Sequence, residues 1–201
     1  MTIVAFYSKG TSIEVQNIWS KRLKFYYPSL KLVPLLSEEA KFATVALLWK
    51  APLNYLNKMT RIKGLISLGQ GVDHILNGNL IPENVPVVRI VDPYMAKSMS
   101  HWVLLSILNI IRETYGYFSQ ENTKIYKPRD EKNFLSLKIG IYGIGAIGSV
   151  VAKDLSHMGF NVRGWSRTKK KIKTVTCFSG NKGFNELITN SDIHVCLLPL
   201  T

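Results

Sequence analysis

The stretch IYGIGAIGSV, residues 141–150, constrains the fold of this chain more than any other segment. Its glycines, Gly143, Gly145 and Gly148, have the spacing G-x-G-x-x-G. The apolar run before them is typical of a strand, and the residues after them have the apolar spacing of a helix. At such a junction the motif predicts a dinucleotide site. The first glycine permits a tight turn, the second lets a pyrophosphate approach the backbone, and the third lets the helix pack against the strand.

We expect the first turn of that helix to hold the phosphates. The N–H groups of Ala146 and Ile147 have no acceptor within the helix and lie at the positive end of its dipole. A helix start of this kind binds anions. A glycine-rich turn can also serve packing alone, but the strand before the motif and the helix after it favour the nucleotide site.

The end of the next expected strand, residues 160–166, indicates which dinucleotide is bound. Sites for NAD place an acidic residue there, about 20 residues after the motif begins, to bind the ribose 2′-hydroxyl. This chain instead has Ser166, Arg167 and Thr168, followed by lysines. Hydroxyl and guanidinium groups can bind a 2′-phosphate, which a carboxylate would repel. The turn therefore predicts NADP, with NAD as the alternative cofactor and a solvated basic turn as the alternative interpretation.

Strand-like and helix-like runs alternate through the first half of the chain. Five runs are typical of strands, namely 2–8, 30–35, 42–49, 64–71 and 85–91. Pro34 suggests a strand end or an edge strand. The sequence T-x-x-E, from Thr11 to Glu14, is a capping box that predicts the start of a helix. Strands that alternate with helices predict βαβ units, a parallel sheet and the α/β class.

The pattern changes at Met95. Residues 95–118 are predicted to form one long helix, with so many apolar residues that we expect it to be buried on two sides. The polar segment 119–136 is predicted to be an irregular connection. A second alternating series follows, with strands at 138–142, 160–166, 174–178 and 192–201 and helices at 146–158 and 184–190.

Composition and charge exclude several classes of protein. The net charge is +13, from 26 basic and 13 acidic residues. Apart from the run 168–173 the basic residues are scattered, so we expect no nucleic-acid partner, and nucleic-acid binding is the weakest alternative. The longest apolar run, 102–111, is about half of a bilayer span, and the N-terminus lacks the features of a signal peptide. We expect a cytoplasmic protein without a membrane partner.

The metal-ligating residue types are few. The two cysteines, Cys177 and Cys196, lie in apolar runs, and neither they nor the four histidines have the spacing of a metal site. We therefore expect no metal, and we expect His74, His157 and His194 to be structural or surface residues.

With these residues in view, the chain resembles the D-isomer-specific 2-hydroxyacid dehydrogenases, and most of all the glyoxylate/hydroxypyruvate reductase A type. The resemblance covers essentially the whole chain. It is carried by LLWKAP (47–52), ISLGQGVDHIL (66–76), VPVVRIVDPYMAKSMSHWVL (85–104), IGIYGIGAIGSVVAKDLSHMGFNVRGWSRT (139–168) and DIHVCLLPLT (192–201). The W-S-R variant at 165–167 accompanies a preference for NADPH in this group.

The resemblance implies two domains. Residues 1–94 would form a flavodoxin-like domain that binds substrate, and residues 95–201 an incomplete Rossmann domain, a doubly wound parallel sheet that binds cofactor. In such enzymes the loop matching Gln70 and Gly71 offers backbone amides to the substrate carboxylate. Trp49 matches a position that lines the substrate pocket, although a half-buried packing role fits it equally well.

The resemblance also implies further site residues and an activity. Leu198, Pro199 and Thr201 match a segment that flanks the cofactor. The implied activity is NADPH-dependent reduction of a small 2-keto acid to the 2-hydroxy acid by a homodimer.

The catalytic residues of such enzymes lie outside the matched stretches. The catalytic Arg, Glu and His of the family lie beyond Thr201, so no catalytic residue is assigned here. We therefore expect a C-terminally truncated, inactive chain, with a non-catalytic dinucleotide-binding or partner-binding protein as the alternative. His101 stands where many members have Glu, and no role is assigned to it.

Overall fold

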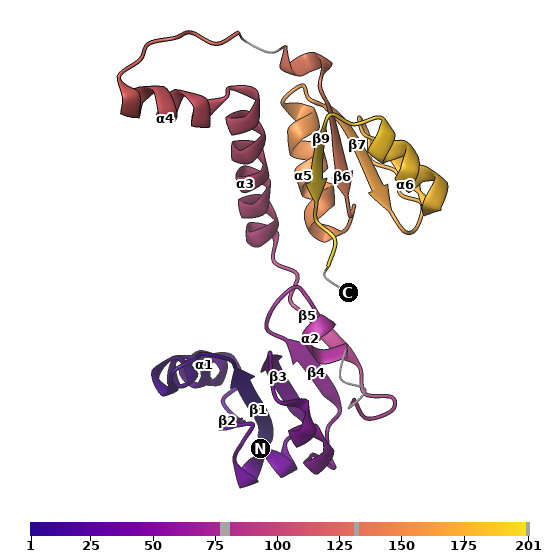
Figure 1. The fold of residues 1–201 in the computed structure, drawn as a ribbon. Coiled ribbons are helices and arrows are strands. Elements are labelled where there is room, and N and C mark those ends of the chain that lie inside the picture. Colours follow the sequence, from indigo (N-terminus) through magenta and orange to yellow (C-terminus); the bar gives the residue numbers. More distant parts are fainter. Residues whose placement is uncertain (77–80, 131–132, 200–201) are drawn as a thin grey trace. The chain divides into compact units, whose positions relative to one another are not determined.

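The computed structural model describes residues 1–76, 81–130 and 133–199. These residues form two compact units, Met1–Val91 and Asp92–Leu198, each built around its own parallel sheet. Figure 1 labels most of the helices and strands of both units. Each unit is described by itself.

The first unit contains a five-stranded sheet in which every neighbouring pair of strands is parallel. The strands are β1 (Thr2–Ser8), β2 (Leu30–Pro34), β3 (Val45–Trp49), β4 (Gly64–Ser67) and β5 (Val87–Arg89), in the order β2-β1-β3-β4-β5. This is the flavodoxin-like order, as predicted. Pro34 is the last residue of an edge strand, where its missing N–H costs no ladder hydrogen bond.

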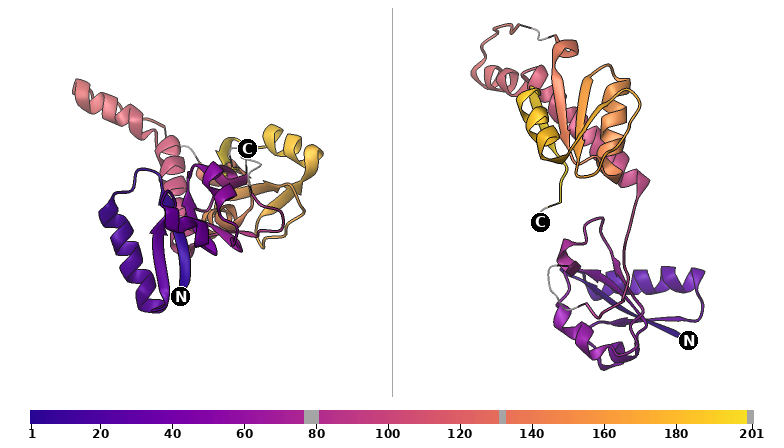
Figure 2. Two further views of the ribbon diagram at one scale, coloured as in Figure 1. Left: turned by 90° about the horizontal axis from the view of Figure 1, so that it is seen from below. Right: turned by 90° about the vertical axis from the view of Figure 1, so that its right-hand side faces the viewer.

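Both faces of this sheet are covered, so its strands are continuous apolar runs. On one face Val4, Phe6 and Leu47 are buried beneath helix α1 (Ile13–Tyr26). The opposite face is covered by the 3-10 turns η1 (Glu38–Phe42) and η2 (Leu53–Lys58) and by α2 (Asp73–Leu76). Figure 2 shows α1 lying to one side of the strands.

The predicted start of α1 is wrong by one residue. The N-cap is Ser12, whose hydroxyl accepts a hydrogen bond from Val15 N at 3.5 Å. Gly10, with a φ of 78°, turns the chain after β1. Thr11 therefore lies in that turn, and the T-x-x-E pattern does not cap the helix.

The second unit contains a four-stranded parallel sheet. Its strands are β6 (Lys138–Tyr142), β7 (Asn161–Ser166), β8 (Thr176–Ser179) and β9 (Ile193–Cys196), in the order β8-β7-β6-β9. In Rossmann numbering this is the order 3-2-1-4, which agrees with the incomplete Rossmann domain that the resemblance implies. Ile139 and Ile141 face α5 (Ala146–His157) and α3 (Pro93–Ile111) within one apolar core. Helix α6 (Gly180–Thr189) covers the other face, where Leu187 approaches Gly140.

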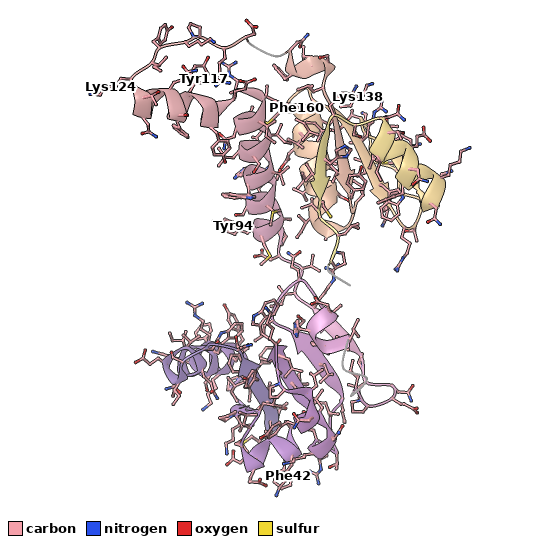
Figure 3. All side chains as sticks on the ribbon, viewed as in Figure 1. Phe42, Tyr94, Tyr117, Lys124, Lys138 and Phe160 are labelled. Atoms are coloured by element: carbon pink, nitrogen blue, oxygen red, sulfur yellow. The ribbon has the colours of Figure 1, made fainter. Side chains whose placement is uncertain are left out.

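The single long helix predicted for 95–118 is wrong. The chain forms two helices, α3 and α4 (Thr114–Thr123), and Glu113 between them has a left-handed backbone with a φ of 50°. Burial on two sides is also not observed in the single chain. One face of α3 is buried, including Val103 and Ile107, while Trp102 is 66% exposed. Figure 3 shows Tyr94 on α3 and Tyr117 on α4 with all side chains drawn.

Several element ends differ from the predictions. Strand β8 begins at Thr176 rather than at 174, because Thr174 has a left-handed φ of 71°. Helix α6 begins at Gly180, four residues earlier than predicted. Strands β5 and β9 are shorter than the apolar runs that contain them. In the connection after α4, a 3-10 turn η3 covers Phe134–Ser136.

The described residues contain neither a membrane-spanning helix nor a cluster of metal ligands. No helix in these ranges is long and apolar enough to cross a membrane. Among the same residues, no group of three or more His, Cys, Asp or Glu side chains could hold a metal ion.

Candidate functional site

The three glycines after β6 occupy three different environments. Gly143 has a φ of 102°, and a Cβ there would lie 2.9 Å from the carbonyl oxygen of Leu197. A Cβ at Gly148 would lie 2.0 Å from the carbonyl oxygen of Gly143, so α5 and the turn touch backbone to backbone. A Cβ at Gly145 would meet nothing within 4 Å. Two glycines are therefore required by the fold, whereas the third leaves space that the protein does not fill.

The start of α5 faces that space. Its N-cap is Gly145, which has no side chain to cap the helix. The N–H groups of Gly143 and Ile144 both donate to Trp165 O, at 2.9 and 3.0 Å. The donors that the fold leaves for a ligand are thus those of the first helical turn, beginning at exposed Ala146 and half-buried Ile147. A pyrophosphate fits here, because Gly145 leaves space where a Cβ would lie and the uncapped N–H groups at the start of α5 can donate to it.

The turn after β7 lies beside this loop, because β7 pairs with β6. Ser166 is buried and donates its hydroxyl proton to Thr168 O at 2.8 Å. Its side chain therefore shapes the turn. Arg167 and Thr168 are exposed, and exposed lysines follow them. The groups at this turn that can reach a ligand are cationic or carry a hydroxyl. Such groups suit a ribose 2′-phosphate better than a free ribose 2′-hydroxyl.

The segment after β9 passes directly behind the glycine turn. Leu197 N donates to Tyr142 O at 2.8 Å. The side chain of Leu198 would lie 3.2 Å from a Cβ at Gly143, and it is 41% exposed. Pro199 is exposed. The predicted site residue Thr201 lies outside the described residues.

In the first unit, Gln70 and Gly71 lie on the loop that follows β4. The backbone carbonyls of this loop are held by side chains. Gln70 O accepts from the Arg89 guanidinium at 3.2 Å, and Gly71 O accepts from the Ser67 hydroxyl at 2.7 Å. Carbonyls that are occupied in this way leave the loop able to present N–H groups, which is what a carboxylate ligand needs.

Trp49 ends β3 and lies against the same loop. A Cβ at Gly69 would lie 2.3 Å from the Trp49 ring, so only glycine fits beneath it. The ring also meets the His74 imidazole edge to face, with centroids 4.8 Å apart. Trp49 is half-buried and therefore packs against the loop, as one of its two predicted roles requires. Lys50 and Arg89 bring positive charge to this end of the sheet, and Asp73 brings one carboxylate close to Gly71.

Sequence reasoning missed Ser67, His74 and Arg89 as contributors to this loop. Ser67 is completely buried, and its hydroxyl lies 3.0 Å from His74 Nε2. Lys50 N donates to His74 Nδ1 at 3.2 Å. Burial lowers the pKa of His74, and Lys50 lowers it further, against the opposing effects of Asp73 and of a backbone hydrogen bond. No spacing in the sequence announces these contacts, which the turn after β4 creates.

The second unit contains two other polar clusters. His194 Nδ1 lies 2.8 Å from the Tyr142 hydroxyl, and burial, followed by the effect of Cys196, raises the pKa of that tyrosine. Asp154 on α5 accepts hydrogen bonds from Lys97 at 2.8 Å and from Ser100 at 2.6 Å. These bonds outweigh the effect of burial and lower the pKa of Asp154, and His101 lowers it slightly further. This cluster joins α3 to α5.

Comparison with known proteins agrees with this geometry. A family model described as "D-isomer specific 2-hydroxyacid dehydrogenase, NAD binding domain" matches residues 102–201. Glyoxylate/hydroxypyruvate reductase A of Yersinia enterocolitica is 32% identical over 188 residues, which are 91% of this chain and 60% of that protein. The chain belongs to the D-isomer-specific 2-hydroxyacid dehydrogenase family.

Solved members of the family have the same fold as this chain. A D-isomer-specific 2-hydroxyacid dehydrogenase from Xanthobacter autotrophicus, in complex with NADPH and MES, matches all of this chain and 64% of its own, with a TM-score of 0.89 and 29% identity. An NADPH-dependent glyoxylate/hydroxypyruvate reductase from Sinorhizobium meliloti, in complex with NADP and sulfate, matches all of this chain and 63% of its own, with a TM-score of 0.87 and 29% identity. The chain spans about 60% of the length of the curated reductases it matches.

Proposed function

We propose that this chain provides the NADPH-binding and carboxylate-binding loops for the reduction of a small 2-keto acid, of the glyoxylate or hydroxypyruvate type, to the 2-hydroxy acid. The observation that carries the proposal is the open space at Gly145, beside the uncapped start of α5 and the exposed Arg167. The X. autotrophicus dehydrogenase and the S. meliloti reductase, which share the fold, were solved in complex with NADPH and NADP, respectively.

NADPH would supply a hydride to the C2 carbonyl of the substrate. The residues of this chain would bind and orient the two reactants. The N–H groups at the start of α5 hold the pyrophosphate, and Arg167 and Thr168 hold the 2′-phosphate. Ser166 supports that turn from within. Leu198 packs beside the glycine loop, and we propose that Leu198, Pro199 and Thr201 contribute to cofactor binding, as the resemblance implies.

We further propose that the first unit, about 1–94, binds the substrate and the second, about 95–201, binds the cofactor. The loop at Gln70 and Gly71 would present backbone N–H groups to the substrate carboxylate. Trp49 would border the bound acid while it packs against Gly69. The positive charges of Lys50 and Arg89 favour an anionic substrate over a neutral one.

Arg167 offers the sharpest test of the cofactor. We expect Arg167→Asp to weaken NADPH binding at least about thirtyfold, because it replaces a charge-assisted hydrogen bond with repulsion, and to change NADH binding less than about threefold. Isothermal titration with each cofactor measures both. Lys173→Asp makes a similar charge change in the same basic segment, and we expect it to affect both cofactors alike. Equal losses for NADPH and NADH in Arg167→Asp would remove the 2′-phosphate assignment.

We also propose that the 201-residue chain alone does not turn over 2-keto acids, which would leave it a non-catalytic dinucleotide binder. Among the described residues no histidine is placed to give a proton to a substrate near the glycine loop. Both nitrogens of His74 are engaged, and His194 contacts Tyr142. His101 lies on α3 within electrostatic reach of Asp154, and His157 is the last residue of α5. Oxidation of NADPH by glyoxylate, followed at 340 nm, would contradict this if it exceeded the rate without protein.

A second copy of the chain is the partner that we propose for α3. Its unburied side is apolar, with Trp102, Leu105 and Ile110 each about half exposed or more, and α4 adds Tyr115 and Phe118. Exposed apolar surface of this kind marks protein contacts. A Trp102→Lys variant should therefore sediment as a monomer under conditions in which the unaltered chain sediments as a dimer.

A further inference from the structure

The loop Leu68–Val72 of the first unit is here called the carboxylate loop, because we propose that it binds the substrate carboxylate. The hydroxyl of Ser67, just before this loop, uses its full hydrogen-bonding capacity. Ser67 Oγ lies 2.7 Å from Gly71 O, 3.2 Å from Gly69 N and 3.0 Å from His74 Nε2. The carbonyl can only accept, so it receives the single hydroxyl proton, and the Gly69 N–H donates to the oxygen. The remaining lone pair requires a donor, and His74 Nε2 must therefore carry a proton.

The other nitrogen of His74 must be bare. Lys50 N donates to Nδ1 at 3.2 Å, and a backbone N–H has no other role than donor. The imidazole is thus neutral, with its proton on Nε2. It joins the end of β3 to the loop after β4, since Lys50 follows β3 directly and Ser67 ends β4. Lys50 has a left-handed φ of 48°, a strained conformation for which this hydrogen bond compensates.

We propose that His74 is a positioning residue that holds the loop Leu68–Val72 in its carboxylate-binding shape only while the imidazole is neutral. The inference rests on the proposed function of that loop. Protonation would place an N–H on Nδ1 directly facing the N–H of Lys50. Two donors repel one another, so the hydrogen bond from Lys50 to His74 would break and the loop would lose that tie to the end of β3.

The surroundings of His74 favour the neutral form at neutral pH. Burial lowers its pKa first, Asp73 acts in the opposite sense and Lys50 lowers it again. Arg89, which holds Gln70 O, adds positive charge to the same loop. A lowered pKa means that the hold on the loop is complete above the ordinary histidine value of about 6.5 and is lost as the pH falls below it.

The first test needs no ligand. In the 201-residue chain, NMR would follow the His74 ring and the backbone amides of Lys50, Gly69 and Gly71 from about pH 8 to about pH 5. We expect the ring and the three amides to share one midpoint below about 6.5. Amides that shift with no common midpoint, or a midpoint above the ordinary value, would overturn the proposal.

Three variants make this readout specific to the two hydrogen bonds. His74→Phe keeps a ring against Trp49 and removes both nitrogens, so the shared midpoint should vanish. His74→Asn keeps an acceptor near the position of Nδ1, so the Lys50 amide should stay hydrogen-bonded at every pH. His101→Phe removes an exposed histidine of the other unit and should leave the midpoint unchanged. A shared midpoint that persists in His74→Phe would overturn the proposal.

The second test measures binding of oxamate, a 2-keto acid analogue with one carboxylate. If only the neutral form binds, the apparent affinity should be constant above the midpoint and fall about tenfold per pH unit below it. Constant affinity over the whole range, or tighter binding in acid, would overturn the inference and leave the proposed function intact. Oxamate that binds at no pH would overturn the substrate role of the loop and this inference with it, while NADPH binding would still test the cofactor loop independently.

Discussion

The two loops that we propose to bind ligands lie in comparable places in their sheets but are held in shape by different means. Each follows the carboxyl end of a strand in a parallel sheet. The loop after β6 is held by backbone contacts, with the N–H groups of Gly143 and Ile144 bonded to Trp165 O and with glycine at each point of close approach. The loop after β4 is held largely by side chains. Ser67 and Arg89 donate hydrogen bonds to its carbonyls, and His74 is hydrogen-bonded to Ser67.

This difference decides how each loop responds to its surroundings. Backbone amides do not titrate near neutral pH, so the glycine loop should keep its shape across that range. An imidazole does titrate there, so the shape of the carboxylate loop should depend on pH. If the two loops bind as proposed, the phosphate-binding loop would therefore be rigid and the substrate-binding loop would respond to pH.

The largest expected effect separates two glycines of one motif. Gly148→Ala should lower the free energy of unfolding of the second unit by about 3 kcal/mol, because its Cβ would strike Gly143 O. Gly145→Ala should cost at most about 1 kcal/mol, the difference between glycine and alanine at an N-cap. It should nevertheless weaken NADPH binding about tenfold or more, because its Cβ takes space needed by the pyrophosphate.

Urea unfolding followed by circular dichroism measures the first quantity, and fluorescence titration measures the second. Equal stability of Gly148→Ala and the unaltered chain would show that the turn can relax. In that case the glycine loop would not be the rigid member of the pair.

An intermediate effect is expected in the side-chain-held loop. Gly69→Ala should destabilise the first unit by about 2 kcal/mol, since its Cβ would enter the Trp49 ring. Trp49→Leu removes that ring, so the same alanine should cost much less in the double variant. A double-mutant cycle from urea unfolding gives the coupling free energy between positions 49 and 69. Additive losses would mean that the Cβ clashes with the backbone and not with the Trp49 ring.

The smallest effect concerns pH. Hydrogen bonds lower the pKa of Asp154, so its contribution to stability is present above the ordinary aspartate value of about 3.9 and is lost as the pH falls below it. Asp154→Asn should cost about 1 kcal/mol at pH 7, after allowance for partial exposure. The difference from the unaltered chain should shrink in acid. A difference that instead shrank in the range just below about pH 6.5, where we propose that His74 acts in the other unit, would contradict the separation of the two units' pH responses.

Much of the fold could be predicted because its signals are local. The glycine motif between a strand and a helix, and the continuous apolar strands, depend on residues that are neighbours in sequence. The alternation predicted parallel sheets, and the resemblance implied flavodoxin-like and Rossmann strand orders; both were confirmed. Pro34 at the end of an edge strand is a further example.

The features that were missed depend on residues far apart in sequence. The break between α3 and α4 has neither glycine nor proline to announce it. Glu113 takes its left-handed backbone where its carboxylate pairs with Arg129, sixteen residues away. In the same way Lys50 and His74, 24 residues apart, meet only because β3 and β4 are adjacent in the sheet. Propensity and periodicity carry no information about such meetings.

The contact between Trp49 and His74 gives the carboxylate loop an optical reporter of its own. The two rings meet edge to face at 4.8 Å, within the range over which an imidazolium interacts with an indole. An imidazolium quenches indole emission more strongly than a neutral imidazole does. In a chain whose other three tryptophans are replaced by phenylalanine, the brightness of Trp49 would therefore record the charge of its neighbour in real time, at concentrations far below those that NMR requires.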